Sequence, residues 1–136
     1  MRMLKDDGAP NPATPYPQGY LNNPALNRAY DNFWNDFLAA DGASVQQHYA
    51  RGWQFVAALF RDKPGLLGYD IFNEPWPGSQ AGSGANLAGC PPKGFDQTLL
   101  TAFTRMTVSA LRAADADHLI FYEPNLQFDY GAQTGL

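Results

Sequence analysis

Residues 66–78 read LLGYDIFNEPWPG, and this segment decides the fold. An apolar stretch, Leu66–Phe72, runs directly into Asn-Glu-Pro and then into an aromatic, proline-rich loop. Apolar side chains fall on both alternating sides of this stretch, which is typical of a strand that is covered on both faces, as in a parallel sheet. We therefore predict a parallel β-strand that places Glu74 at its carboxyl end.

Two helices are predicted before this strand. Apolar residues recur at helical spacing within residues 26–38, and Asp41-Gly42 interrupts the pattern. Ser44 and Gln47 then have the spacing of a capping box, and a second helical pattern follows from Val45 to Phe60. Residues 63–65, Lys-Pro-Gly, end that helix.

A third helix and a second strand follow a long loop at residues 75–95. Asp96 is a candidate N-cap. The helical face predicted after it consists of Leu99, Phe103, Met106 and Ala110, with Leu100 and Leu111 on its flank. The apolar run Leu119–Tyr122 predicts the second strand, which ends in Glu-Pro-Asn.

The predicted order is helix, strand, helix, strand, with short turns before the strands and long loops after them. This asymmetry is typical of α/β barrels, in which the loops after the strands carry the site. A closed (β/α)8 barrel takes about 250 residues. We therefore expect residues 1–136 to be a single fragment of a barrel domain, with loop at 1–25, the αβαβ region at 26–126 and loop at 127–136.

Composition excludes several classes of function. Hydrophobic residues make up 45% of the chain and charged residues 16%, as in a globular domain. A net charge of −4 without a basic run argues against nucleic acid, and no apolar run approaches the ~20 residues of a membrane span. The first residues lack the apolar segment of a signal peptide, and the compartment stays undecided.

The sequence predicts neither a metal site nor a cofactor. Its two histidines and single cysteine lack the spacing of metal ligands, and no phosphate-binding glycine loop is present. Cys90 is open to two interpretations, a free thiol or a disulfide with a cysteine outside these residues.

Both predicted strands end in Glu-Pro, which places Glu74 and Glu123 on the same rim. A carboxyl group beside an aromatic surface can hold a proton and give it to a leaving sugar oxygen. Glu74 is the candidate proton donor, against the alternative of a helix-capping carboxylate. Asn73 either contacts substrate or favours the turn into Pro75, and Trp76 either stacks on a sugar or packs beneath the loop.

Residues 68–78, GYDIFNEPWPG, resemble glycoside hydrolase family five, the cellulase-type (β/α)8 barrels. More narrowly, Trp-Pro-Gly at 76–78, Gly-Cys at 89–90 and Phe-Tyr-Glu-Pro at 121–124 resemble the endoglycoceramidase-like branch. The resemblance spans about residues 26–126. It implies a central fragment that covers about strands four and five of the barrel.

The resemblance implies a retaining glycosidase that cleaves a β-linked glycan or glycolipid without a cofactor. Glu74 would be the general acid/base, and Asn73 would bind the sugar hydroxyl next to the reacting carbon. The nucleophile would be a Glu at the end of strand seven, outside this chain. Glu123 would support the site or contact substrate, and its alternative role as nucleophile is less favoured.

Three alternatives stay open at this point. The first is an endo-β-1,4-glucanase of the same family. The second is a non-catalytic carbohydrate-binding protein on the same scaffold. The third is an inactive truncated barrel. The oligomeric state is not indicated by the sequence.

Overall fold

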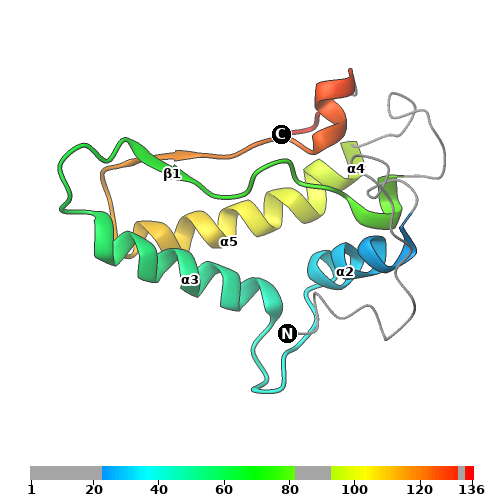
Figure 1. The fold of residues 1–136 in the computed structure, drawn as a ribbon, viewed down its shortest axis with the longest axis horizontal. Helices are drawn as coiled ribbons and strands as arrows, with labels where there is room; N and C mark the ends of the chain where they lie inside the picture. The colour runs from blue at the N-terminus through cyan, green and yellow to red at the C-terminus, as the bar shows by residue number, and fades with distance from the viewer. Residues whose placement is uncertain (1–22, 82–92, 132–133) are drawn as a thin grey trace.

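The computed structural model of this protein describes residues 23–81, 93–131 and 134–136 (Figure 1). Two helices, α2 (Pro24–Trp34) and α3 (Val45–Phe60), precede strand β1 (Gly68–Asp70) and the short 3₁₀ helix η2 (Gly78–Ala81). A continuous helical run follows, composed of α4 (Lys93–Phe95), the π-helix η4 (Asp96–Leu100) and α5 (Thr101–Arg112). The described part ends with strand β2 (Leu119–Phe121) and the 3₁₀ helix η5 (Leu126–Tyr130).

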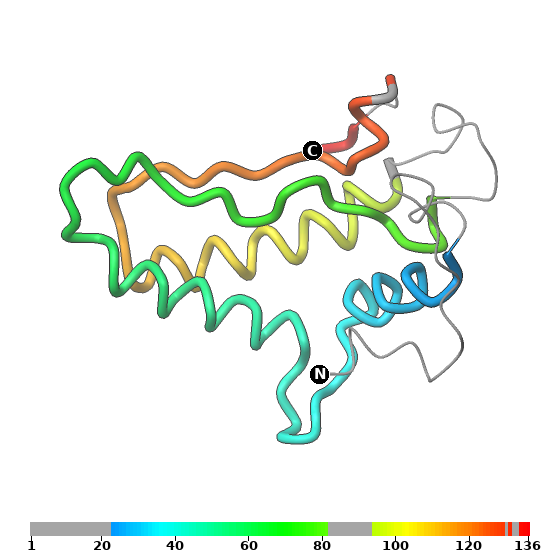
Figure 2. Tube along the Cα trace, in the orientation of Figure 1, coloured from blue at the N-terminus to red at the C-terminus, as the bar shows by residue number. Residues whose placement is uncertain are grey.

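The two strands pair in parallel, as the sequence predicted. Tyr69 lies opposite Ile120 and Asp70 opposite Phe121. Beyond the paired residues, the Ile71 N–H donates to the Phe121 carbonyl at 3.1 Å. Gly68 is required in this register because a β-carbon there would collide with the carbonyl oxygen of Leu119. Figure 2 shows the two strand segments side by side, so the turns that follow them lie at the same end of the sheet.

Helices α3 and α5 pack together on one side of the strands (Figure 1). Ala57 from α3 and Leu111 from α5 are fully buried against Tyr69 and Ile71 of the first strand segment. Tyr69 and Ile71 face the helices while Asp70 between them is exposed, so at Asp70 the strand is not covered on both faces as the sequence predicted.

An aromatic cluster supports the end of β1. It consists of the buried residues Phe33, Trp34, Phe95, Leu100 and Phe103, with Phe72 packed against them. The Phe103 ring lies 5.3 Å from that of Phe33 and 5.6 Å from that of Phe72, both at steep edge-to-face angles. Edge-to-face packing of this kind adds to the free energy gained by burying the rings. The cluster therefore fixes Phe72, which immediately precedes Asn73.

The first helix differs from its prediction at both ends. It begins at Pro24, within the expected loop, because the Asn23 side chain accepts from the N–H groups of Ala25 and Leu26. It ends at Trp34 instead of residue 38, because Asp36 adopts a left-handed backbone with φ of 54°. The capping box of Ser44 and Gln47 at the start of α3 is confirmed.

The helix around Asp96 also differs from its prediction. Asp96 is not an N-cap but a fully buried residue within the helical run, in the π-helical segment. The wider π turn shifts the helical register, so the buried face consists of Leu100, Phe103, Thr107 and Leu111, of which Leu100 and Leu111 were predicted only for the flank of that face. The expected loop at 127–136 is partly a 3₁₀ helix.

The predictions for residues 1–22, the loop around Cys90 and residues 132–133 lie outside the described residues. Across the part of the chain that is described, no helix has the length and apolar character needed to cross a bilayer.

A buried polar cluster lies at the opposite end of the strands, next to the start of β2. The Tyr69 hydroxyl donates to Asp115 Oδ2 at 2.7 Å, and His118 Nδ1 lies 2.7 Å from the same oxygen. Asp115 Oδ1 accepts from the N–H groups of Asp117 and His118 at 3.0 and 3.2 Å. The hydrogen bond from Tyr69 holds the pKa of Asp115 well below its ordinary value of 3.8. Burial, followed by this same bond, raises the pKa of Tyr69 to about 12.

These pKa shifts predict two limits of pH stability. Below about pH 4 the unfolded state binds a proton at Asp115 before the folded state does, so stability falls as pH falls. Between pH 10 and about 12 the unfolded state loses the Tyr69 proton first, so stability falls as pH rises. We expect urea midpoints measured across pH to decline at both ends, and the Tyr69→Phe variant to lose part of the alkaline decline. Identical alkaline slopes in both proteins would contradict this assignment.

Candidate active site

The carboxyl ends of the two strands converge on one pocket. Asn73 and Glu74 follow β1, Glu123 follows β2, and parallel pairing brings these ends together. A pocket of about 280 Å³ lies between them, lined by Asn73, Glu74, Glu123, Pro124, Leu126, Phe128 and Asp129. The structure therefore assembles three of the four residues that the sequence singled out as site candidates.

The backbone of Glu74 has an uncommon conformation. Its φ is 47°, in the left-handed region that residues other than glycine rarely adopt. Its N–H donates to Oε2 of Glu123 at 2.7 Å. The Glu74 and Glu123 side chains are half-buried, and the Asn73 side chain is exposed. Positive φ in such a residue marks a local constraint of the kind found at functional sites.

Further contacts tie the two strand ends together. The Leu126 N–H donates to the Pro75 carbonyl at 3.0 Å. The buried side-chain amide of Asn125 donates to both carboxylate oxygens of Asp96, each at 3.0 Å. Sequence reasoning missed Asp96 and Asn125 as supporting residues. No local pattern could have found them, since the two residues are 29 positions apart and meet only in the folded chain.

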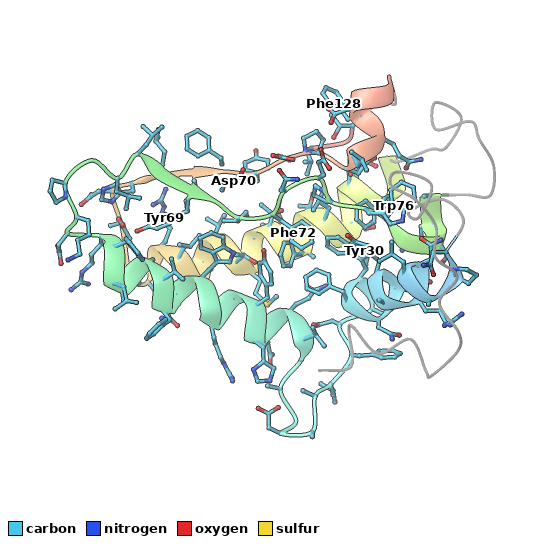
Figure 3. All side chains as sticks on the ribbon, in the orientation of Figure 1. Tyr30, Tyr69, Asp70, Phe72, Trp76 and Phe128 are labelled. Atoms are coloured by element: carbon cyan, nitrogen blue, oxygen red, sulfur yellow. The ribbon has the colours of Figure 1, made fainter. Side chains whose placement is uncertain are left out.

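Trp76 is a packing residue in this structure. Its side chain is 2% exposed, and its indole N–H donates to Asn27 Oδ1 at 2.8 Å. Its carbonyl accepts from the indole N–H of Trp34 at 2.7 Å. Figure 3 shows the ring between the segment that follows Glu74 and helix α2. Stacking on a sugar needs an open ring face, so of the two interpretations left open by the sequence, packing beneath the loop matches the structure.

Gly78 completes this attachment to α2. It has φ of 68°, and a β-carbon there would collide with the Asp31 carboxylate. The same Asp31 oxygen accepts from the Ser79 N–H at 2.9 Å. The Trp-Pro-Gly segment therefore attaches the turn after β1 to helix α2.

The arrangement offers acid–base chemistry. Three carboxyl groups and one carboxamide border a small, partly open pocket, where a carboxyl group can reach a bound oxygen atom. Within residues 23–81, 93–131 and 134–136, no three His, Cys, Asp or Glu side chains gather as a metal site would need.

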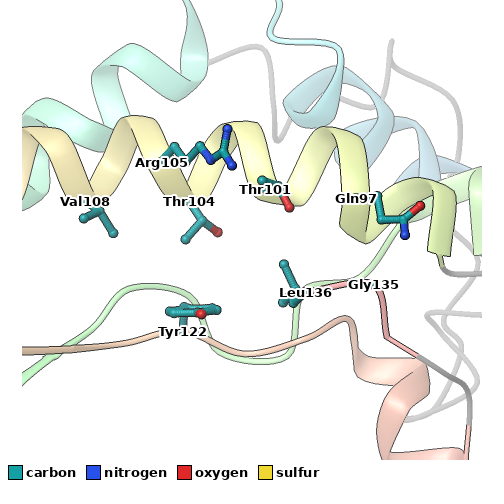
Figure 4. A pocket seen from close by; sticks show the side chains of 8 residues that line it. All are labelled: Gln97, Thr101, Thr104, Arg105, Val108, Tyr122, Gly135 and Leu136. Atoms are coloured by element: carbon teal, nitrogen blue, oxygen red, sulfur yellow. The ribbon is translucent and has the colours of Figure 1, made fainter.

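A larger cavity of about 470 Å³ lies elsewhere, between α5 and β2 (Figure 4). Thr104 and Arg105 of α5 line it on one side, with Tyr122 and Leu136 on the other. No carboxyl side chain lines it, so the acid–base groups belong to the smaller pocket.

Comparison with known proteins points to one family. Residues 25–133 match the model of the family described as Cellulase (glycosyl hydrolase family 5). Endoglycoceramidase I of Rhodococcus hoagii is 32% identical over 120 residues, which cover 88% of this chain and 22% of that protein. An endoglycoceramidase of Hydra vulgaris is 26% identical over 122 residues, covering 84% of this chain and 22% of its own length.

A solved structure has the same fold. Endo-glycoceramidase II from Rhodococcus sp., in complex with ganglioside GM3, superimposes with a TM-score of 0.78 at 31% identity. The match covers 99% of this chain and 28% of that protein. The same protein has also been solved as a lactosyl-enzyme intermediate. The chain thus spans less than a third of the length of the relatives that it matches.

Proposed function

The chain belongs to the cellulase family, glycosyl hydrolase family 5, and within it to the endoglycoceramidase-like branch; from this premise we propose that it contributes the general acid/base to a retaining β-glycosidase that acts on glycolipids. The fold is accordingly that of part of a (β/α)8 barrel. The observation that carries the proposal is the position of Glu74, which lies beyond the carboxyl end of β1 and borders the pocket shared with Asn73 and Glu123. Catalytic side chains of such barrels lie at this end of the strands.

In the first step, the Glu74 carboxylic acid gives its proton to the glycosidic oxygen as the bond from that oxygen to the sugar breaks. A carboxylate nucleophile outside this chain forms the new bond to the same sugar carbon. In the second step, the Glu74 carboxylate takes a proton from water, and the water oxygen displaces the nucleophile. Two inversions at one carbon leave the β-configuration of the sugar unchanged.

Asn73 is proposed to bind the sugar hydroxyl next to the reacting carbon. Its carboxamide has both donors and an acceptor, it is exposed, and it borders the same pocket as Glu74. The retaining course is supported by the lactosyl-enzyme intermediate of the Rhodococcus relative, because a covalent glycosyl-enzyme is the intermediate of a retaining reaction.

Glycolipid is proposed as the substrate class because the endoglycoceramidase-like relatives are identical to this chain at about a third of the aligned positions, and one was solved with ganglioside GM3. A β-1,4-glucan is the second candidate, favoured by the family's description as Cellulase.

An assay of two substrates separates these candidates. The full-length protein that carries these residues is incubated with ganglioside GM3 in detergent micelles and, separately, with a soluble β-1,4-glucan. We expect intact oligosaccharide to be released from the glycolipid, and proton NMR in the first minutes to detect its β-anomer. Faster cleavage of the glucan would instead support the glucanase. Binding without release would support a carbohydrate-binding protein, and neither binding nor release would contradict the proposal.

A further inference from the structure

The backbone N–H of Glu74 and the carboxylate of Glu123 form a direct link between the two strand ends. The donor–acceptor distance is 2.7 Å, and the two residues are 49 positions apart in the chain. We propose that Glu123 is the positioning residue of the acid/base: by accepting this hydrogen bond it holds Glu74 in its left-handed backbone conformation and thereby directs the Glu74 side chain into the pocket. This inference rests on the proposed function of Glu74.

The need for such a partner follows from the backbone of Glu74. A left-handed φ is unfavourable for a residue with a β-carbon, and a following proline favours extended backbone. An uncommon backbone conformation persists only when contacts with the surrounding structure hold it in place. A side-chain carboxyl oxygen is a good acceptor for a backbone N–H, so Glu123 supplies a suitable restraint.

The position of Glu123 is itself fixed on both sides. Before Glu123 in the chain, the parallel pairing of β2 with β1 fixes the backbone, with Phe121 opposite Asp70. After it, the Leu126 N–H binds the Pro75 carbonyl, and Asn125 is anchored to the fully buried Asp96. The acceptor therefore cannot move far without disrupting a buried polar contact, which is costly.

The link predicts a specific defect when the acceptor is lost. If φ of Glu74 relaxes, its carboxyl group leaves the position from which it protonates the leaving oxygen. A substrate with an alcohol leaving group needs that proton, whereas a substrate with an activated phenolate leaving group does not. The value of kcat/KM reports the step in which the leaving group departs. Comparing kcat/KM on the two substrates therefore separates misplacement of the acid from a general loss of folded enzyme.

The experiment compares Glu123→Ala, Glu123→Gln and Glu74→Gln in the full-length protein that carries these residues. Two substrates are used, a lactosyl lipid and 2,4-dinitrophenyl β-lactoside. For Glu123→Ala we expect kcat/KM on the lipid to fall by about 10-fold to 100-fold, a part of the total effect of a general acid, with a change on the dinitrophenyl substrate below about 3-fold. Glu123→Gln is expected to rescue the lipid activity, since its carboxamide oxygen accepts the same hydrogen bond.

Amide hydrogen exchange at Glu74 provides a readout that is independent of turnover. The Glu74 N–H should exchange at least about 10-fold faster in Glu123→Ala than in the unaltered protein, because it loses its acceptor, and Glu123→Gln should restore the protection.

Several outcomes would overturn the inference. Equal losses on both substrates in Glu123→Ala would indicate a purely structural role. Complete inactivity of Glu123→Gln on both substrates would assign Glu123 as nucleophile. Full lipid activity of Glu123→Ala alongside an inactive Glu74→Gln would refute the positioning role while the proposed function stands. An unaltered protein that hydrolyses neither substrate would refute the proposed function and this inference with it.

Discussion

The Glu74→Gln variant is expected to hydrolyse a glycolipid about 10²-fold to 10⁴-fold more slowly than the unaltered protein, which is the usual contribution of a general acid. The carboxamide has nearly the shape of the carboxyl group but has no acidic proton to give. The backbone contact with Glu123 does not involve the Glu74 side chain, so the substitution leaves that contact in place. Binding of substrate, measured by calorimetry, should therefore survive while turnover is lost.

Asp62→Asn is the matched control for this substitution. It makes the same change from carboxylate to carboxamide at a side chain that is 86% exposed, in the turn after α3 and outside the pocket. Initial rates of lipid hydrolysis should be unaffected by it. Retention of most of the activity by Glu74→Gln would rule out Glu74 as the proton donor.

Phe103→Ala is expected to lower the free energy of unfolding by about 3–5 kcal/mol, the usual cost of truncating a buried Phe. Phe103 is fully buried, and its ring contacts those of Phe33, Trp34, Tyr49 and Phe72. The neighbouring rings come from α2, α3 and the end of β1, so the vacated space cannot be closed by a local shift of one element. The measurement is the urea unfolding midpoint of the full-length protein.

Phe55→Ala removes the same atoms from a side chain of α3 that is 65% exposed. Its expected effect is below about 1 kcal/mol, as for most surface substitutions. Equal effects of the two substitutions would mean that the aromatic cluster does not stabilise the fold as described.

Much of the fold follows from local sequence. The capping box of Ser44 and Gln47, the helix from Val45 to Phe60 and the alternation through Tyr69 and Ile71 are each encoded by neighbours in the chain. The parallel pairing was also predicted, because the strand has apolar residues on both faces. Asn73 and Glu74 were chosen as the candidate amide and acid because they directly follow the predicted strand Leu66–Phe72.

The errors in prediction have one physical origin. The first helix was predicted too long because helical spacing continued to Leu38, whereas the left-handed backbone of Asp36 ends it. Asp96 has the composition of an N-cap, yet it lies buried in a π turn because Asn125 and Thr134 bind its carboxylate. In each case the prediction used the spacing of residue types along the chain. That spacing does not reveal the backbone conformation of Asp36 or the partners of the Asp96 carboxylate.

The sequence by itself determined the order of helices and strands, the position of Glu74 at a strand end and the family, because these depend on periodicity and on a contiguous motif. Only the tertiary structure decided that Trp76 is covered by α2 and that Glu123 binds the backbone of Glu74. Both contacts join residues 49 positions apart. Such contacts depend on strand register and helix packing, which are set by the burial of the whole core and not by any one segment.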